Sequence, residues 1–362
     1  MEGPHGGNIY RAAVQLGVNE AEIIDFSASI NPLGVPKSVM AAIKDEMRFL
    51  YNYPDPDAKQ FTLALARNFA VDPESILCGN GSTELIYLVV RALNPQRVLV
   101  TAPTFSEYEL AAGDRRDIIH FKLHAKDDFA FNSEAFITAM AGGENSTSYK
   151  MALTTSVDMA FLCNPNNPTG SIIRKSDMMK IAEAARDLKC HLVIDEAFID
   201  FTPEESMINE VEENPYIIVL RSLTKFYALS GLRVGYGVFP LKLIDTMRKH
   251  KEPWTVNTLA QVAGIASLKD ESYKADTFKI IKTEKKTLED GFRLLEIPYF
   301  PSAANFFLIQ LDKAQDVINS LFEKGILLRD CSNFRNLGGA YARIAVKSNR
   351  DNMRLLKELA NR

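Results

Sequence analysis

The chain has 362 residues, of which 46% are hydrophobic and 24% are charged, and its formal net charge at pH 7 is −4. This composition is typical of a soluble globular protein large enough for two subdomains, and the net negative charge gives no electrostatic reason to expect binding to nucleic acid. The first residues contain no basic stretch followed by an apolar one, and no apolar run is long enough to span a bilayer, so we expect neither a signal peptide nor a membrane partner.

Four cysteines are scattered along the chain and form no Cys-x-x-Cys pair: Cys78, Cys163, Cys190 and Cys331. Three of them stand beside or within apolar runs, where reduced thiols are commonly buried. We therefore expect a reduced, cytoplasmic protein without a metal site.

Residues 1–37 show no clear periodicity, and we expect them to form an N-terminal arm that packs on the C-terminal part of the chain. From residue 38 to residue 240, short β-branched runs alternate with patterns of helical period. The strand candidates are 75–78, 97–101, 118–122, 159–163, 191–195, 217–220 and 234–239, and the helix candidates are 58–69, 83–93 and 175–188. Nearly continuous apolar strands of this kind predict a large α/β domain with a mostly parallel, seven-stranded sheet covered on both faces. Ligands of such sheets bind beyond the carboxyl ends of the strands.

After Pro240 the pattern changes, and residues 241–362 predict a smaller α+β domain. Its expected elements are helical stretches at 241–267 (broken near Pro253) and 272–295, a strand at 305–310, a helix at 314–324, and strands at 326–329 and 342–346. Within the larger domain, residues 142–148 predict a surface loop.

The segment Gly79-Asn80-Gly81-Ser82-Thr83 ends one strand candidate and opens a helix candidate. Exposed backbone amides and the helix dipole make such a helix start suitable for a phosphate group. The same residues also fit a glycine turn followed by an ordinary Ser or Thr N-cap, and taken alone they favour that simpler interpretation.

Two further candidates follow the next strands. Phe105, in Pro103-Thr104-Phe105, could stack on a flat heteroaromatic ring, although a single phenylalanine most often belongs to a core. Asn167, in the turn Asn164-Pro165-Asn166-Asn167-Pro168-Thr169-Gly170, could donate its amide to a phenolate oxygen or hold the backbone of its own turn. The turn as a whole is more specific than any residue in it.

Asp195 closes the apolar run 190–194, and Lys225 stands in Ser222-Leu223-Thr224-Lys225, with Arg233 further along the chain. Each has an ordinary alternative, such as a helix cap for Asp195 and a solvated surface side chain for Lys225. Together, an amine, a carboxylate, an amide-rich turn and a guanidinium at successive strand ends suit a cofactor with an aldehyde, a basic ring nitrogen, a phenolic oxygen and a phosphate. Pyridoxal 5'-phosphate has all four groups.

With these motifs the chain resembles the fold-type I pyridoxal-phosphate enzymes of the histidinol-phosphate aminotransferase group over nearly its whole length. Within that group it is most similar to the L-threonine-O-3-phosphate decarboxylases. This similarity lies in His-Gly-Gly-Asn at 5–8, Asp-Phe-Ser-Ala-Ser-Ile-Asn-Pro-Leu-Gly at 25–34, Asp-Glu-Ala-Phe-Ile-Asp-Phe at 195–201 and Arg-Asp-Cys-Ser-Asn-Phe at 329–334. Phe198 departs from the aminotransferases of the group, which commonly have tyrosine there, whereas the decarboxylases share the phenylalanine.

The resemblance implies a role for each candidate residue. Lys225 attaches the cofactor covalently, Asp195 pairs with its ring nitrogen, Asn167 faces its phenolic oxygen and Phe105 stacks on its ring. The implied phosphate-binding set is Gly81, Ser82, Thr83, Ser222, Thr224 and Arg233, together with Tyr53 reaching over from the neighbouring subunit of a homodimer. The implied substrate-binding set is His5, Asn31, Asn167, Arg329 and Arg343, in which Arg343 takes a carboxylate and Arg329, with His5 and Asn31, takes a phosphate.

The activity implied by the resemblance is decarboxylation of L-threonine O-3-phosphate to (R)-1-amino-2-propanol O-2-phosphate in cobalamin biosynthesis. L-Serine O-phosphate stays open as a substrate, because one methyl group rarely gives more than about 1–3 kcal/mol of discrimination. The alternative is a histidinol-phosphate aminotransferase of histidine biosynthesis, which would share every cofactor residue and require 2-oxoglutarate. A non-catalytic regulator on the same fold is a third class, and it would need an added DNA-binding domain.

Overall fold

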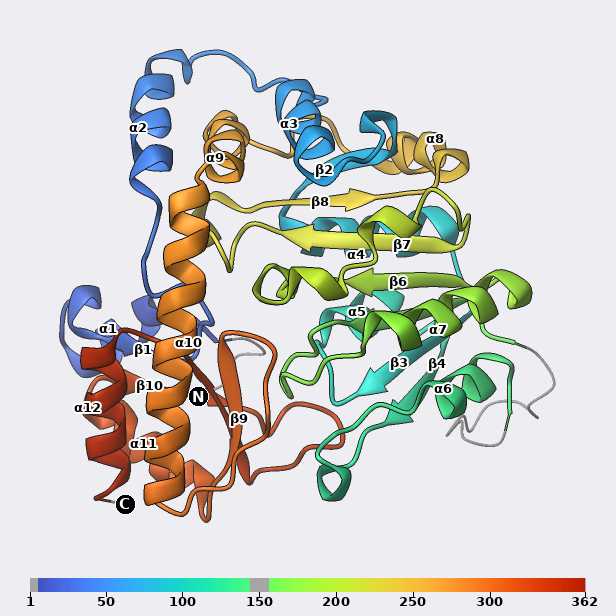
Figure 1. The fold of residues 1–362 in the computed structure, drawn as a ribbon. Helices are drawn as coiled ribbons and strands as arrows, with labels where there is room; N and C mark the ends of the chain where they lie inside the picture. The colour runs from blue at the N-terminus through green and yellow to red at the C-terminus, as the bar shows by residue number, and fades with distance from the viewer. Residues whose placement is uncertain (1–5, 144–155, 362) are drawn as a thin grey trace.

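The computed structural model describes residues 6–143 and 156–361, and its centre is a seven-stranded sheet (Figure 1). The strands are β2 (Ile76–Asn80), β3 (Arg97–Ala102), β4 (Asp117–Lys122), β5 (Met159–Cys163), β6 (His191–Asp195), β7 (Ile217–Ser222) and β8 (Val234–Val238). Their order across the sheet is β2-β8-β7-β6-β5-β3-β4. Strand β8 is antiparallel to both of its neighbours, and the other pairs are parallel. The expected mostly parallel α/β sheet is therefore confirmed.

Helices cover both faces of this sheet because its central strands are apolar on both sides. In β5, Phe161 packs with α4 (Gly81–Leu93) and α8 (Leu241–His250) on one face, whereas Leu162 packs with α6 (Ser133–Met140) and α7 (Lys175–Leu188) on the other. The side chains alternate because successive residues of a strand point to opposite faces. Helices α3 (Lys59–Phe69) and α9 (Thr258–Leu268) extend the second layer beyond β2.

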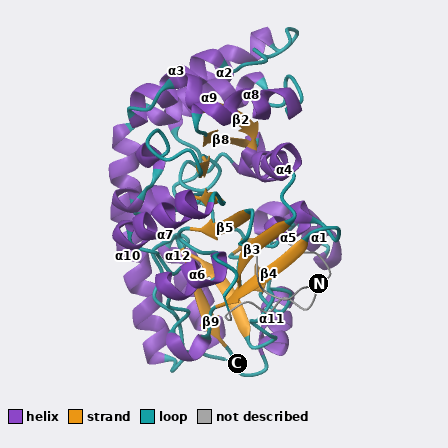
Figure 2. Ribbon diagram, turned by 90° about the vertical axis from the view of Figure 1, so that its right-hand side faces the viewer, coloured by secondary structure: helices purple, strands orange, loops and turns teal. Residues whose placement is uncertain are grey.

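The C-terminal part is built on a second, three-stranded antiparallel sheet, ordered β11 (Arg329–Asp330), β12 (Tyr341–Ala345) and β9 (Phe306–Gln310). Its helices are α10 (Glu271–Leu294), α11 (Ala314–Glu323) and α12 (Asn349–Leu359). Figure 2 shows this sheet below the large one, with α10 running along both parts. The small sheet thus lies next to the carboxyl-end edge of β5, β6 and β7, which is where ligands of parallel sheets bind.

The N-terminal residues contact the C-terminal part. Strand β1 (Ile24–Asp25) pairs in parallel with β10 (Ile326–Leu327), and Phe26, with no exposed surface, belongs to the apolar core that β9, β12 and α12 share. After this strand the chain crosses to α2 (Lys37–Glu46), which packs against α9.

Several helices have no counterpart among the expected elements. Helix α1 (Ile9–Leu16) has eight residues and begins at Asn8, whose side chain accepts a hydrogen bond from the Arg11 amide. Helix α12 is amphipathic and follows the last of the expected strands. The expected strand 326–329 is two short strands in two different sheets. The expected surface loop at 142–148 lies mostly outside the described residues.

Within residues 6–143 and 156–361, none of the helices combines the length and the apolar character that crossing a bilayer requires.

Replacing Phe26 by alanine tests how much stability the docking of the arm contributes. The ring is fully buried, so Phe26→Ala should lower the free energy of unfolding by about 3 kcal/mol, near the low end for a buried phenylalanine. Urea denaturation measures this change. Tyr10→Ala, in the same arm but 69% exposed, is the control and should cost less than about 0.5 kcal/mol. Equal effects of the two substitutions would mean that Phe26 is not held in that core.

Candidate active site

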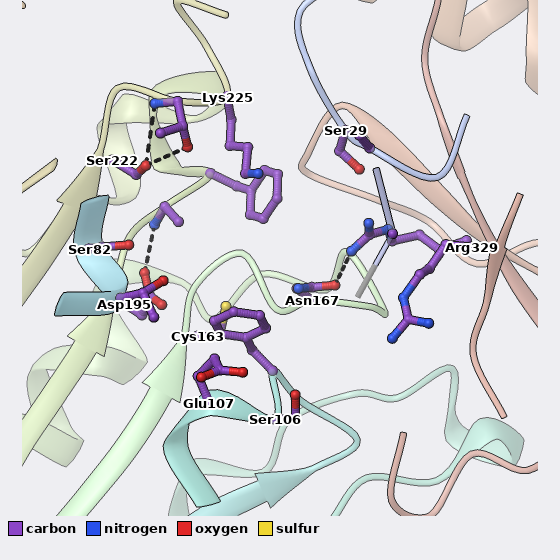
Figure 3. A pocket seen from close by; sticks show the side chains of 18 of the residues that line it. Ser29, Ser82, Ser106, Glu107, Cys163, Asn167, Asp195, Ser222, Lys225 and Arg329 are labelled. Atoms are coloured by element: carbon purple, nitrogen blue, oxygen red, sulfur yellow. Dashed lines mark hydrogen bonds between the residues drawn. The ribbon is translucent and has the colours of Figure 1, made fainter. Parts of the chain in front are cut away.

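A cavity of about 480 Å³ opens at the carboxyl ends of the parallel strands, between the large sheet and the C-terminal part (Figure 3). Its size is within the ordinary range of ligand pockets. Eleven residues expected from the sequence line it: Ser82, Thr83, Phe105, Asn167, Asp195, Ser222, Thr224, Lys225, Arg233, Arg329 and Arg343. Three others, Gly81, Asn31 and Tyr53, are not among its lining residues, and His5 lies outside the described residues.

Lys225 extends from the turn after β7 toward the centre of the cavity (Figure 3). Burial, together with the positive charges of Arg343 and Arg233, lowers the pKa of its amine from 10.5 to about 8. Both effects disfavour the charged form of an amine. A substantial fraction of Lys225 is therefore neutral near physiological pH, as a nucleophile for an aldehyde must be.

Asp195 ends β6 and lies in the wall below Lys225 in Figure 3. Its Oδ2 accepts a hydrogen bond of 2.8 Å from the Tyr108 hydroxyl, and its Oδ1 accepts one of 3.0 Å from the backbone N–H of Ala197. Burial raises the pKa of the Asp195 carboxyl to about 6, and the two hydrogen bonds act against that rise. Tyr108 is itself fixed, because its ring stacks on Phe161 with centroids 5.0 Å apart. Asp195 is thus a preoriented acceptor for a protonated base.

Asn167 and Arg343 are joined by a hydrogen bond between β12 and the turn after β5. Arg343 donates through Nη1 to the Asn167 Oδ1 and through Nη2 to the Ser27 carbonyl, the latter at 2.8 Å. A guanidinium has only donors, so it must face the amide oxygen and not the amide nitrogen. The Asn167 Nδ2 consequently points into the cavity, toward the side of Lys225 and Asp195 (Figure 3). It is oriented to donate to an anionic oxygen.

A cup suited to a phosphate lies where β2, β7 and β8 meet the start of α4. Gly235 of β8 pairs with both Gly79 and Ser222, and a Cβ on it would lie 2.5 Å from the Ser82 amide nitrogen. A side chain there would therefore force α4 away from the sheet. Gly81 has a φ of +73°, and a Cβ on it would lie 2.6 Å from the Arg233 Nη2.

The polar groups of this cup are close together. Ser222 Oγ and Thr224 Oγ1 are 2.7 Å apart, and no side chain caps the first turn of α4 at Asn80. The first-turn amides, two hydroxyls and one guanidinium then face one small volume, which is the donor set that phosphate prefers. Gly81 contributes by giving room to Arg233 although it does not line the cavity.

Two arginines face the cavity from the C-terminal part. Arg329 and Arg343 are directly opposite each other on β11 and β12. Burial, with a smaller contribution from the charge of Arg329, lowers the pKa of Arg343 from 12.5 to about 10. Arg329 donates to the Asp330 carbonyl at 2.6 Å and to Asn333 Oδ1 at 2.9 Å, which fixes the direction of its guanidinium. In Figure 3, Arg329 lies on the side of the cavity opposite Ser82 and Ser222 of the phosphate cup.

Asn31 does not take part in the cavity, in contrast to the expectation. Its Nδ2 donates to the Phe226 carbonyl and to Thr277 Oγ1, both at 2.7 Å, and its Oδ1 accepts from the Leu33 amide at 3.0 Å. The side chain is thus fully used in joining the arm to the turn after Lys225 and to α10. A role in binding substrate receives no support from this geometry.

Ser29, two residues earlier, lines the cavity and was missed in the sequence. It is 1% exposed, and its hydroxyl has no hydrogen-bond partner in the described part of the chain. Figure 3 places it between Lys225 and Arg329. Burying a hydroxyl without a partner costs free energy, so a site of this kind is suited to a polar ligand. A serine in a loop carries no pattern from which this could have been foreseen.

Phe198 and Tyr53 occupy different surroundings. Phe198 is 4% exposed, lines the cavity and packs edge-on against Phe306 with ring centroids 5.0 Å apart. Tyr53 is 83% exposed and contacts the Trp254 ring at 5.3 Å, on the outer surface.

These residues fit pyridoxal 5'-phosphate. The glycine-lined cup suits its phosphate, and the neutral amine of Lys225 suits its aldehyde. The Asp195 carboxylate suits its ring nitrogen, and the Asn167 amide suits its phenolic oxygen. Among the described residues, no group of three or more His, Cys, Asp or Glu side chains could hold a metal ion.

Comparison with known proteins places the chain among enzymes. Residues 21–359 match the family model described as aminotransferase class I and II. The chain is 38% identical to a threonine-phosphate decarboxylase from Salmonella typhimurium, over 99% of this chain and 96% of that protein. It is 33% identical to a histidinol-phosphate aminotransferase from Caldanaerobacter subterraneus, over 92% and 91%. Among solved structures, the histidinol-phosphate aminotransferase of Clostridium acetobutylicum has a TM-score of 0.84 and 28% identity, covering 94% of this chain and 98% of that one.

The lowered pKa of Lys225 predicts an unusual pH dependence. Trapping of pyridoxal 5'-phosphate by borohydride on the cofactor-free protein should increase as the pH rises through about 8 and then level off, because the amine loses its proton there and not at 10.5. Peptide mapping by mass spectrometry locates the pyridoxyl group, and Lys225→Ala should lack it. A pyridoxyl group on another lysine, or trapping that increases only near pH 10, would contradict the assignment.

Proposed function

Because the chain belongs to the aminotransferase class I and II family, whose members depend on pyridoxal 5'-phosphate, we propose that this enzyme decarboxylates L-threonine O-3-phosphate. Its cofactor is pyridoxal 5'-phosphate. The product would be (R)-1-amino-2-propanol O-2-phosphate, and we place the reaction in cobalamin biosynthesis. The whole-length similarity to a threonine-phosphate decarboxylase supports this choice.

When bound, the cofactor supplies a protonated ring that accepts the electron pair left by a broken bond at the substrate's α-carbon. Asp195 holds the proton on the ring nitrogen, and Tyr108 and the Ala197 amide hold Asp195 in place. Asn167, whose oxygen is held by Arg343, would donate through Nδ2 to the phenolic oxygen, and Phe105 would stack on the ring. Lys225 carries the proton that the α-carbon receives after carbon dioxide has left.

The observation that carries the substrate assignment is the pair of opposed guanidiniums on β11 and β12. Threonine phosphate has two anionic ends, and a guanidinium can bind either one bidentately. We assign the carboxylate to Arg343, which is fixed by Asn167 and Ser27, and the phosphate to Arg329. The Ser29 hydroxyl lines the same cavity and has no partner among the described residues, so it is available to a polar group of the substrate.

The orientation of the carboxylate decides the reaction. The bound cofactor would favour cleavage of whichever α-carbon bond stands perpendicular to its ring, since that bond would overlap the π-system. Holding the carboxylate on Arg343 and the phosphate on Arg329 leaves the substrate little freedom to rotate about its α-carbon. Decarboxylation then competes with loss of the α-hydrogen, the first step of transamination.

A second candidate is histidinol-phosphate aminotransferase, which the 33% identity over 92% of the chain supports. It would use the same cofactor residues. Its amino acceptor, 2-oxoglutarate, is also a dianion, so the arginine pair alone does not separate the two functions. A requirement for 2-oxoglutarate does.

We also propose a homodimer in which Tyr53 reaches the cofactor phosphate of the neighbouring subunit. Its 83% exposure and its absence from the cavity of its own subunit support this arrangement. The proposed organisation has an arm at 1–37, a cofactor-binding domain at 38–240 and a small domain at 241–362. The arm joins the other two parts through Phe26 and Asn31.

The deciding experiment is incubation of the purified holoenzyme with L-threonine O-3-phosphate in the absence of any keto acid. Aminopropanol phosphate and carbon dioxide should form in equal amounts over many turnovers, as followed by mass spectrometry and a coupled carbon dioxide assay. L-Serine O-phosphate in parallel measures the contribution of the methyl group. Turnover of histidinol phosphate only with 2-oxoglutarate, and none of threonine phosphate, would replace the decarboxylase by the aminotransferase.

Exchanging each arginine for lysine separates the roles of the two anionic ends. Arg329→Lys should lower the preference for phosphorylated over free threonine in kcat/KM by about tenfold or more, because a point charge cannot copy bidentate binding. Arg343→Lys should instead increase the fraction of turnovers that end in abortive transamination, measured as pyridoxamine phosphate formed per carbon dioxide released. An unchanged phosphate preference in Arg329→Lys would move the phosphate subsite elsewhere.

A further inference from the structure

The segment between α8 and α9 carries a lysine whose ammonium contacts the first turn of α4, the helix that begins at the phosphate cup. Lys251 is only 10% exposed in its side chain although it stands in a surface connection. Its Nζ donates to Glu84 Oε1 at 3.1 Å, to the Glu252 carbonyl at 3.4 Å and to Thr255 Oγ1. Long flexible lysines are mostly solvated, so three acceptors around one buried ammonium indicate a specific position.

Glu84, the partner of Lys251, lies in the first turn of α4. Its second oxygen, Oε2, accepts the backbone N–H of Asn80 at 2.5 Å, so the carboxylate closes the turn that leads into the cup. Its side chain is 17% exposed. A single carboxylate therefore joins the start of α4 to the segment after α8.

This carboxylate creates an electrostatic problem at the cup. Glu84 lines one surface hollow together with Thr83 and Arg233, two of the groups that face the phosphate. An uncompensated negative charge there would repel a phosphate dianion. It would also compete with that dianion for the Arg233 guanidinium. Lys251 places a positive charge directly on the same carboxylate.

We propose that Lys251 is a positioning residue for the cofactor phosphate: by neutralising Glu84, it lets that carboxylate brace the first turn of α4 without repelling the phosphate or capturing Arg233. The inference rests on the proposed seat of the cofactor phosphate at the start of α4. It holds for a decarboxylase and for an aminotransferase alike, because both would bind the phosphate in the same cup.

The structural alternative is that Lys251 only anchors the segment between the two helices. Arg91, at the far end of α4, already holds this segment, donating to Glu252 Oε1 at 2.9 Å and to the His250 carbonyl. An anchoring role would affect every ligand of the cavity equally. A charge-compensating role would affect only ligands that carry a phosphate.

The test compares pyridoxal 5'-phosphate with pyridoxal on the cofactor-free full-length protein. Both aldehydes react with Lys225, and they differ only in the phosphate. Lys251→Met should weaken binding of pyridoxal 5'-phosphate by on the order of tenfold, in line with one uncompensated charge near the site, and leave pyridoxal unchanged. The dissociation constants come from absorbance titrations, and the difference should shrink in high salt because salt screens it.

The double variant Glu84→Gln/Lys251→Met provides the decisive comparison. Glutamine can still accept the Asn80 N–H through its amide oxygen, so the brace remains while both charges are gone. The double variant should regain most of the affinity for pyridoxal 5'-phosphate. If it binds as weakly as Lys251→Met, or if pyridoxal weakens in parallel, Lys251 is an anchor and the inference is wrong.

Arg248→Met is the matched control. Arg248 stands on α8 near Lys251, but its side chain is 46% exposed and its guanidinium pairs at 3.2 Å with Glu74, a carboxylate outside α4. Its loss should change neither dissociation constant. The wild-type protein tests the phosphate seat separately from the role of Lys251. If it binds pyridoxal 5'-phosphate no more tightly than pyridoxal, the proposed phosphate seat itself is wrong, whatever the variants do.

Discussion

The candidate active site is governed by an excess of positive charge in a confined space. Four cationic side chains line the cavity, Lys225, Arg233, Arg329 and Arg343, against two acidic ones, Asp195 and Glu107. Desolvated cations raise one another's free energy, which is why burial and neighbouring charges lower the pKa of both Lys225 and Arg343. Anionic ligands relieve this repulsion. A phosphate-bearing cofactor and a substrate with two anionic ends are therefore what the cavity is best suited to bind.

The positions of these four cationic side chains explain why distant parts of the chain must line the cavity. A single sheet edge could not bring both Arg233 and Arg343 to the walls of one cavity. The large sheet supplies the phosphate cup and Lys225, the small sheet supplies Arg329 and Arg343, and the arm supplies Ser27 and Ser29. Arg343 joins all three, through Asn167 and the Ser27 carbonyl. The side chain that we assign to the substrate carboxylate thus also orients the amide that we assign to the cofactor.

The sequence was most informative where chemistry and strand pattern coincide. The runs that became β5, β6 and β7 are apolar on both faces, so their ends, and with them Asp195 and Lys225, could be placed beforehand. Loops lack such a period. The chain turns between Ala28 and Ile30, whose amide donates to the Ala28 carbonyl at 2.9 Å, and this turn directs Asn31 toward α10 while Ser29 faces the cavity. Lys251 could not be found either, because its partner lies 167 positions away in the sequence.

The topology of the large sheet has a consequence for the order of events during synthesis. Strand β8 separates β2 from β7, so the glycine-lined cup cannot exist until residue 238 has been made and has paired with residues 76–80. Arg343 arrives later still, 176 positions after its partner Asn167. Contacts of such long range form slowly, since loop closure precedes any gain from pairing. A ribosome-bound fragment that ends between Lys225 and residue 238 would accordingly contain the reactive lysine but lack the cup, and cofactor retention would report that β8 has been inserted between β2 and β7.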